Sequence, residues 1–66
     1  MKSRKFPSFD DAIKYCEERG SLKYYGREGQ HFEYCIYTLT IGNKVYHVNI
    51  HDNGLLDVVD ERWKER

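Results

Sequence analysis

The sequence has few of the residues that mark specialised classes of small protein. It contains one proline and two cysteines, Cys16 and Cys35, among 66 residues. Two cysteines are too few for the disulfide framework of a small secreted scaffold, and their spacing is not that of a zinc site. We therefore expect both thiols to be reduced and to lie in the core.

Net charge and long apolar runs are also lacking. Eleven Lys and Arg residues balance eleven Asp and Glu residues, so no overall field attracts nucleic acid or an anionic membrane. No apolar stretch is long enough to span a bilayer, and the basic start MKSRKFPSFDDA is not followed by the apolar segment of a secretory signal. We expect a cytoplasmic protein that does not bind membranes.

Aromatic residues, by contrast, are abundant. The chain has six Tyr, three Phe and one Trp. A chain near the lower size limit for a stable core must place these rings either in that core or against a partner.

The segment SFDDAIKYCEERG, residues 8–20, predicts one helix with both ends marked. Ser8 is the expected N-cap, two aspartates follow in the first turn, where the helix dipole favours negative charge, and Gly20 fits the left-handed position that closes a helix. Apolar residues recur at helical spacing and form one stripe, which holds Phe9, Ala12, Ile13 and Cys16. This stripe is the face that the helix must bury.

After Gly20 the pattern changes to the alternation of β-strands. Three segments rich in β-branched and aromatic residues, 31–41, 45–50 and 55–60, are separated by turn residues at 42–43 and 52–54. The segment LKYY, residues 22–25, is a candidate fourth strand at an edge, and the sequence leaves its pairing open.

The turn lengths determine how these strands pair. A two-residue turn between the first two strands, at Gly42-Asn43 or at Asn43-Lys44, gathers their apolar residues on one face, which holds Cys35, Tyr37, Leu39, Ile41, Tyr46, Val48 and Ile50. The loop at residues 52–54, with Gly54 at a positive φ, then pairs Ile50 with Leu56 and Val48 with Val58.

The predicted fold is α+β: one N-terminal helix packed on one face of a three- to four-stranded antiparallel meander. We expect a single domain over residues 1–66, with residues 1–6 as a basic, mobile arm. The final segment DERWKER should either extend the last strand or form a short helical turn.

The stretch VYHVNIHDNG raises the question of a metal or catalytic site. On a strand, His47 and His51 have Cα atoms about 13 Å apart, which is too far for one zinc ion bound at about 2.0 Å from each nitrogen. Asp57 should lie opposite Asn49 and diagonal to both histidines, so one imidazole can bond its carboxylate. This arrangement is an orienting pair without a nucleophile, and we expect no enzyme activity, no metal and no cofactor.

The sheet face away from the helix should be polar in a sheet covered on one side only, but here it is half apolar. An apolar patch within a polar rim is typical of a contact surface. The predicted partner-binding residues are Tyr34, Ile36, His47, Asn49, His51, Asp57 and Val59, with Trp63 as an anchor. Alternatively, the C-terminal segment folds back and Trp63 covers this face.

These features favour a small, non-enzymatic protein-binding module. It would be a regulator or inhibitor that occupies a partner's surface, of the kind that phages and other mobile elements encode. A second copy of the chain is one expected partner, which would make a homodimer through the open sheet face.

The alternative is a nucleic-acid-binding accessory protein. Basic residues lie near rings that can stack on bases, and the candidate residues are Lys2, Arg4, Lys5, Lys23, Tyr25 and Arg27. The balanced charge and the acidic residues in the same segments weigh against this reading.

The order of a helix, then YTLTI and KVYHVNIHDNGLLDVV, resembles the PepSY module. The resemblance covers residues 9–60 and implies a helix followed by a meander whose last two strands join at a tight polar-glycine turn. PepSY proteins are typically exported or membrane-tethered regulators of peptidases. Only the topology is carried over to this chain.

Overall fold

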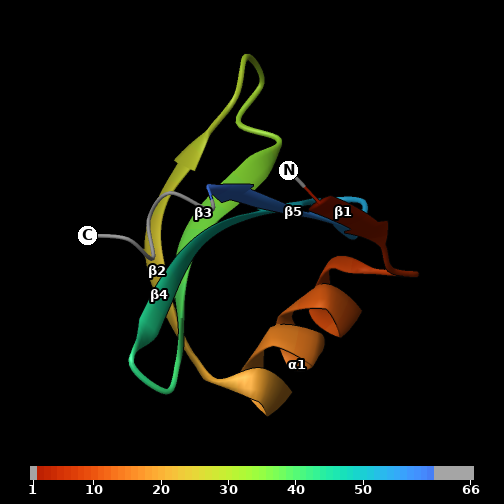
Figure 1. Ribbon diagram of the computed structural model, residues 1–66. Coiled ribbons are helices and arrows are strands. Elements are labelled where there is room, and N and C mark those ends of the chain that lie inside the picture. Colours follow the sequence, from red (N-terminus) through yellow and green to blue (C-terminus); the bar gives the residue numbers. More distant parts are fainter. Residues whose placement is uncertain (1, 61–66) are drawn as a thin grey trace.

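The structure is a computed structural model that describes the backbone of residues 2–60 and the side chains of residues 3–58. Its elements follow the order β1 (Lys2–Lys5), α1 (Phe9–Arg19), β2 (Ser21–Glu28), β3 (Tyr34–Ile41), β4 (Lys44–His51) and β5 (Leu55–Asp60). The strands form one antiparallel sheet in the order β1-β5-β4-β3-β2, and α1 lies against one side of it (Figure 1). The predicted α+β class with an antiparallel sheet is confirmed. No helix within residues 2–60 is long and apolar enough to cross a membrane.

The sheet has five strands, more than the three or four expected, because the N-terminal segment joins it. Lys2–Lys5, which we expected to be a mobile arm, forms β1 and pairs antiparallel with β5. The physical reason is the next residue, Phe6: its side chain is buried, and its N–H donates to the carbonyl of Gly54 at 2.9 Å. An anchored Phe6 directs the residues before it along β5, so α1 follows one strand of the sheet instead of preceding all of them.

The candidate strand at residues 22–25 is present and longer than expected. It belongs to β2, which forms the sheet edge opposite β1. The pairing of β2 with β3 shifts register between Tyr24 and Gly26. Tyr25 is the extra, unpaired residue of this bulge, and Gly26 resumes the ladder by pairing with Ile36.

The start of α1 agrees with the sequence, and its end does not. The N–H of Asp11 donates to Oγ of Ser8 at 3.2 Å, which confirms Ser8 as the N-cap. The expected left-handed Gly20 is wrong, since its φ of −176° is extended and the chain turns directly into β2. Glycine is needed here for space: a Cβ would collide with the carbonyl oxygen of Thr40.

The expected faces of both hairpins are confirmed, and of the two turns left open at the first hairpin the structure has Gly42-Asn43, because Ile41 pairs with Lys44. Tyr37 pairs with Val48, and Ile50 pairs with Leu56. Between the sheet and α1 lies the core, whose buried members are Phe6, Ala12, Cys16, Leu39, Val48, Ile50 and Leu56. Cys16 and Cys35 are both free and buried, as expected.

Candidate functional site

The outer face is the side of the sheet opposite α1, built by the residues that alternate with the core positions. The expected contact residues Tyr34, Ile36, His47, Asn49, His51 and Asp57 belong to it by their register, and all are half-buried. Val59 is a residue of β5 whose side chain lies outside the described part of the chain, and Trp63 lies outside it altogether. The alternatives for Trp63 and for DERWKER therefore remain predictions.

A row of paired residues, polar except for Ile36, crosses the outer face at its centre. Ile36 of β3 pairs with Asn49 of β4, Asn49 pairs with Asp57 of β5, and Asp57 pairs with Ser3 of β1. Because β1 completes this row, one end of the outer face is built by a segment that the sequence did not predict to be a strand.

The expected diagonal contact forms at His51. Its Nε2 lies 3.3 Å from Oδ2 of Asp57, and both side chains are largely buried. The Tyr34 ring packs on the other side, with ring centroids 4.9 Å apart. Since the ring and the carboxylate fix the imidazole from two sides, His51 is held in one orientation at the surface.

A metal site would require more ligands than His51 and Asp57 provide. Among residues 3–58, whose side chains the structure describes, no group of three or more His, Cys, Asp or Glu is placed to hold a metal ion. His47 and His51 both lie on β4, the geometry in which one ion cannot reach both.

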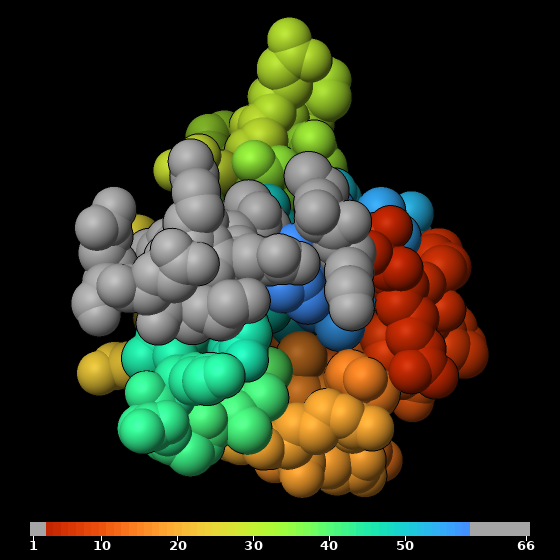
Figure 2. Space-filling view, viewed as in Figure 1, coloured from red at the N-terminus to blue at the C-terminus, as the bar shows by residue number. Residues whose placement is uncertain are grey.

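Exposed aromatic side chains gather on the β2–β3 hairpin, whose tip projects from the rest of the molecule (Figures 1 and 2). Tyr24, Tyr25 and Phe32 have exposed fractions of 58%, 72% and 63%. Phe32 also has a φ of +52°, a conformation that is rare for a bulky residue and that marks local strain. The Tyr25 ring lies at the outer face, 5.9 Å from that of His47.

Of these three rings, only Tyr25 was among the predicted site residues, as a nucleic-acid contact; Tyr24 and Phe32 were not. One signal was present: adjacent residues of a strand point to opposite faces, so Tyr24 and Tyr25 cannot both enter one core. The conformation of Phe32 had no sequence signal.

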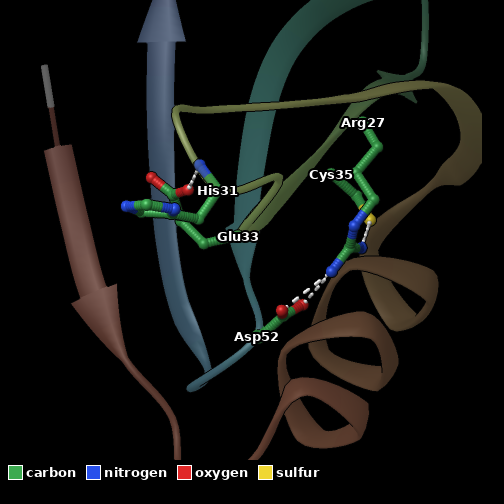
Figure 3. Close-up of polar contacts among 5 residues, drawn as sticks. All are labelled: Arg27, His31, Glu33, Cys35 and Asp52. Atoms are coloured by element: carbon green, nitrogen blue, oxygen red, sulfur yellow. Dashed lines mark hydrogen bonds and ion pairs between the residues drawn. The ribbon is translucent and has the colours of Figure 1, made fainter.

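Polar contacts of Arg27 and of Glu33 hold the base of the loop between β2 and β3 (Figure 3). Arg27 of β2 donates from Nη2 to both carboxylate oxygens of Asp52 at 2.7 and 2.8 Å, and from Nη1 to Sγ of Cys35 at 2.7 Å. The bond to Asp52 raises the pKa of Arg27 above its usual value. The β2 strand is thereby tied to the turn between β4 and β5.

Glu33 makes the polar contacts at the β3 end of this loop. The carboxylate of Glu33 accepts from the backbone N–H of His31 at 2.9 Å, and this bond lowers the pKa of Glu33. The Glu33 carbonyl accepts from the N–H of Asp52 at 2.9 Å. The projecting loop is therefore fixed at its base from both sides.

The candidate nucleic-acid residues do not come together on one surface. Lys2, Arg4 and Lys5 belong to β1 and Lys23, Tyr25 and Arg27 to β2, and these strands are the two opposite edges of the sheet. Arg4 stacks on the rings of Phe6 and Tyr15, at 4.9 and 5.0 Å from their centroids. Lys5 bonds the carbonyl of Phe6, so two cations of β1 have internal partners.

Comparison with models of protein families, with curated proteins and with solved structures found no match for this chain. The resemblance to the PepSY module is thus one of element order in residues 9–60. The function must be argued from the surfaces themselves.

Proposed function

We propose that this chain is a small protein-binding module that acts by occupying another protein's surface with its outer face, and not by catalysis. The observation that carries the proposal is the placement of Tyr25. This side chain is 72% exposed, yet its ring is held beside His47 at the outer face. Large rings fixed in exposed positions supply contact area at a low entropic cost, which is why tyrosine is enriched at protein interfaces.

The chemistry of the outer face supports the same reading. Ile36 lies between Gly26 on β2 and Asn49 on β4, so an apolar side chain sits beside a position without a side chain. An apolar partner group can fill that position. Asn49 offers both a hydrogen-bond donor and an acceptor next to it, which adds specificity.

The rigidity of the outer face favours binding as well. Its side chains stand on strands whose ladders fix the backbone, and the pair of His51 with Asp57 fixes a further group. A surface that is already ordered loses little conformational freedom when a partner docks.

The test begins by capturing the partner. Replacing Tyr34 by p-azidophenylalanine places a photoreactive group on the outer face, and irradiation in the cells that make the protein links it to whatever lies there. The captured protein is then produced in isolation and its affinity for the unmodified chain is measured by calorimetry.

Two matched variants decide whether the outer face is the binding surface. Ile36→Asp should weaken binding at least about tenfold, because a buried apolar contact is replaced by a desolvated charge. Asn43→Asp adds the same charge in the exposed turn between β3 and β4 and should bind like the unmodified chain. Equal binding by a folded Ile36→Asp variant would contradict the proposal, and circular dichroism of that variant establishes that it is folded.

A further inference from the structure

The sheet has two edge strands, and they differ in their capacity to pair with another strand. An edge strand presents backbone N–H and C=O groups that the sheet does not satisfy, so it can accept a strand from another chain. β1 has four residues, while β2 has eight. Within residues 2–60 no strand pairs with the outer edge of either.

β1 is unsuited to pairing with its own copy. Its sequence is KSRK. Every antiparallel two-fold register of three or more residue pairs brings basic side chains opposite each other, and like charges directly opposite are destabilising. Short, lysine-rich edges are a common means by which proteins prevent edge-to-edge association.

β2 has the opposite property, because its sequence SLKYYGRE is complementary to itself. A two-fold axis between Tyr25 and Gly26 places Lys23 opposite Glu28 of the second copy, and the symmetry repeats this ion pair. The same register places Tyr24 opposite Arg27, a ring opposite a guanidinium, again twice. Both kinds of cross-strand pair are favourable.

The bulge in β2 makes this register sterically consistent. In a regular strand, Lys23 and Glu28 would point to opposite faces, because their positions differ by an odd number of residues and side chains alternate between the two faces. The register shift between Tyr24 and Gly26 corrects this: Lys23 pairs with Thr38 and Glu28 with Tyr34, and both partners belong to the outer face. Tyr24 and Arg27 pair with Tyr37 and Cys35 and so share the face toward α1.

We propose that β2 pairs antiparallel with β2 of a second copy of this chain, which joins the two sheets into one continuous sheet. A bulge normally discourages edge pairing, since the extra residue interrupts the ladder. Here both copies carry the bulge at the two-fold axis, so the interruptions lie opposite each other. Tyr24 and Tyr25, which are 58% and 72% exposed, are then partly covered by the second copy.

This dimer goes beyond the proposed function: it uses the edge of β2 and leaves the row through Ile36, Asn49 and Asp57 accessible to a different protein, while Tyr25 lies where the two surfaces meet. It also differs from the homodimer through the open sheet face that the sequence suggested. The two surfaces can be separated by experiment.

Charge reversal tests the register directly. Lys23 and Glu28 are exposed, so their reversal should leave the fold unchanged. In a dimer of the Lys23→Glu variant, the new Glu of each copy faces Glu28 of the other copy, so two repulsive pairs form. In a dimer of the Glu28→Lys variant, the new Lys of each copy faces Lys23 of the other copy, again twice. Each single variant should raise the dimer dissociation constant at least about tenfold at low salt, and the difference should shrink as salt screens the charges.

The decisive sample is the mixture of the two single variants. In a mixed dimer, Glu at position 23 of one copy meets Lys at position 28 of the other, and the remaining Glu28 meets Lys23. Sedimentation velocity over a concentration series should show dimers restored in the mixture, and also in the double variant Lys23→Glu/Glu28→Lys.

Three results would overturn the β2 dimer: a wild-type chain that stays monomeric to millimolar concentration, a dimer that neither single reversal weakens, or a mixture that does not recover. A dimer that Ile36→Asp dissociates while the reversals leave it intact would place self-association on the outer face instead. Binding of another protein is measured independently by calorimetry. A failure of the dimer proposal therefore leaves the proposed function testable, and the reverse also holds.

Discussion

Cys16 lies on the buried side of α1 with no exposed surface. This burial raises the pKa of its thiol to about 11, against a smaller lowering effect of the nearby Arg19. A thiol in this state stays protonated and unreactive in the folded protein, which agrees with a structural role in the core.

The raised pKa of Cys16 predicts how stability depends on pH. In the unfolded chain this thiol ionises near pH 8.5, whereas in the folded protein it stays protonated up to about pH 11. The unfolded state thus loses its proton first, so the stabilising contribution is complete below about pH 8.5 and is lost as the pH rises toward 11. Urea unfolding between pH 8 and 10 should show a free energy of unfolding that falls with a limiting slope of about 1.4 kcal/mol per pH unit.

The control for this dependence is Cys16→Ala, which removes the titrating group. Its free energy of unfolding should change less with pH over the same range. Parallel curves for the two proteins would show that Cys16 ionises equally in the folded and unfolded states.

Among the elements, the turn between β4 and β5 determines more than the pairing of those two strands. Gly54 in this turn has a φ of +96°, and a Cβ on it would meet the carbonyl oxygens of Phe6 and Ser8. Its own carbonyl accepts from the N–H of Phe6. One glycine therefore joins the β4–β5 turn to the segment that leads from β1 into α1.

Substitution of Gly54 should consequently disturb several elements at once. Gly54→Ala forces a strained φ and a backbone collision, and we expect a loss of at least about 1–3 kcal/mol in the free energy of unfolding. Gly26→Ala is the matched control, since no atom lies within 4 Å of the added Cβ and its φ is not in the left-handed region. It should change stability by about 0.5 kcal/mol or less. Urea unfolding of both variants measures the difference, and equal losses would contradict the role of Gly54.

The whole molecule has a small core, so each buried side chain is a large share of its stability. For 66 residues the expected free energy of unfolding is about 3–10 kcal/mol. Ile50 and Val48 are the largest hydrophobic side chains that are nearly free of solvent contact, and they hold the centre of the sheet against α1.

A series of smaller side chains at position 50 tests how much of the free energy of unfolding the buried Ile50 provides. Ile50→Val should cost about 0.5–1.5 kcal/mol and leave the fold intact, whereas Ile50→Ala should cost about 2–5 kcal/mol and unfold much of the population. Ile41→Ala removes the same atoms from a side chain that is 40% exposed and should cost less. Thermal unfolding followed by circular dichroism gives the order of the three, and an Ile50→Ala variant as stable as Ile41→Ala would place the core elsewhere.

The sequence by itself determined the elements whose signals are local. Ser8 and the aspartates after it mark the helix start, the apolar spacing marks its buried face, and the two short turns set the pairing of β3 with β4 and of β4 with β5. That pairing was enough to predict the contact of a histidine with Asp57, because register alone decides which side chains are diagonal neighbours.

Only the tertiary structure decided the features that depend on distant segments. β1 has no strand pattern of its own and becomes a strand because Phe6 is anchored at Gly54. Gly20 is required by the approach of Thr40 and not by a left-handed helix end. The faces of Lys23 and Glu28 follow from a bulge that alternation along the sequence does not reveal, because alternation counts residues and a bulge adds one without turning the strand over.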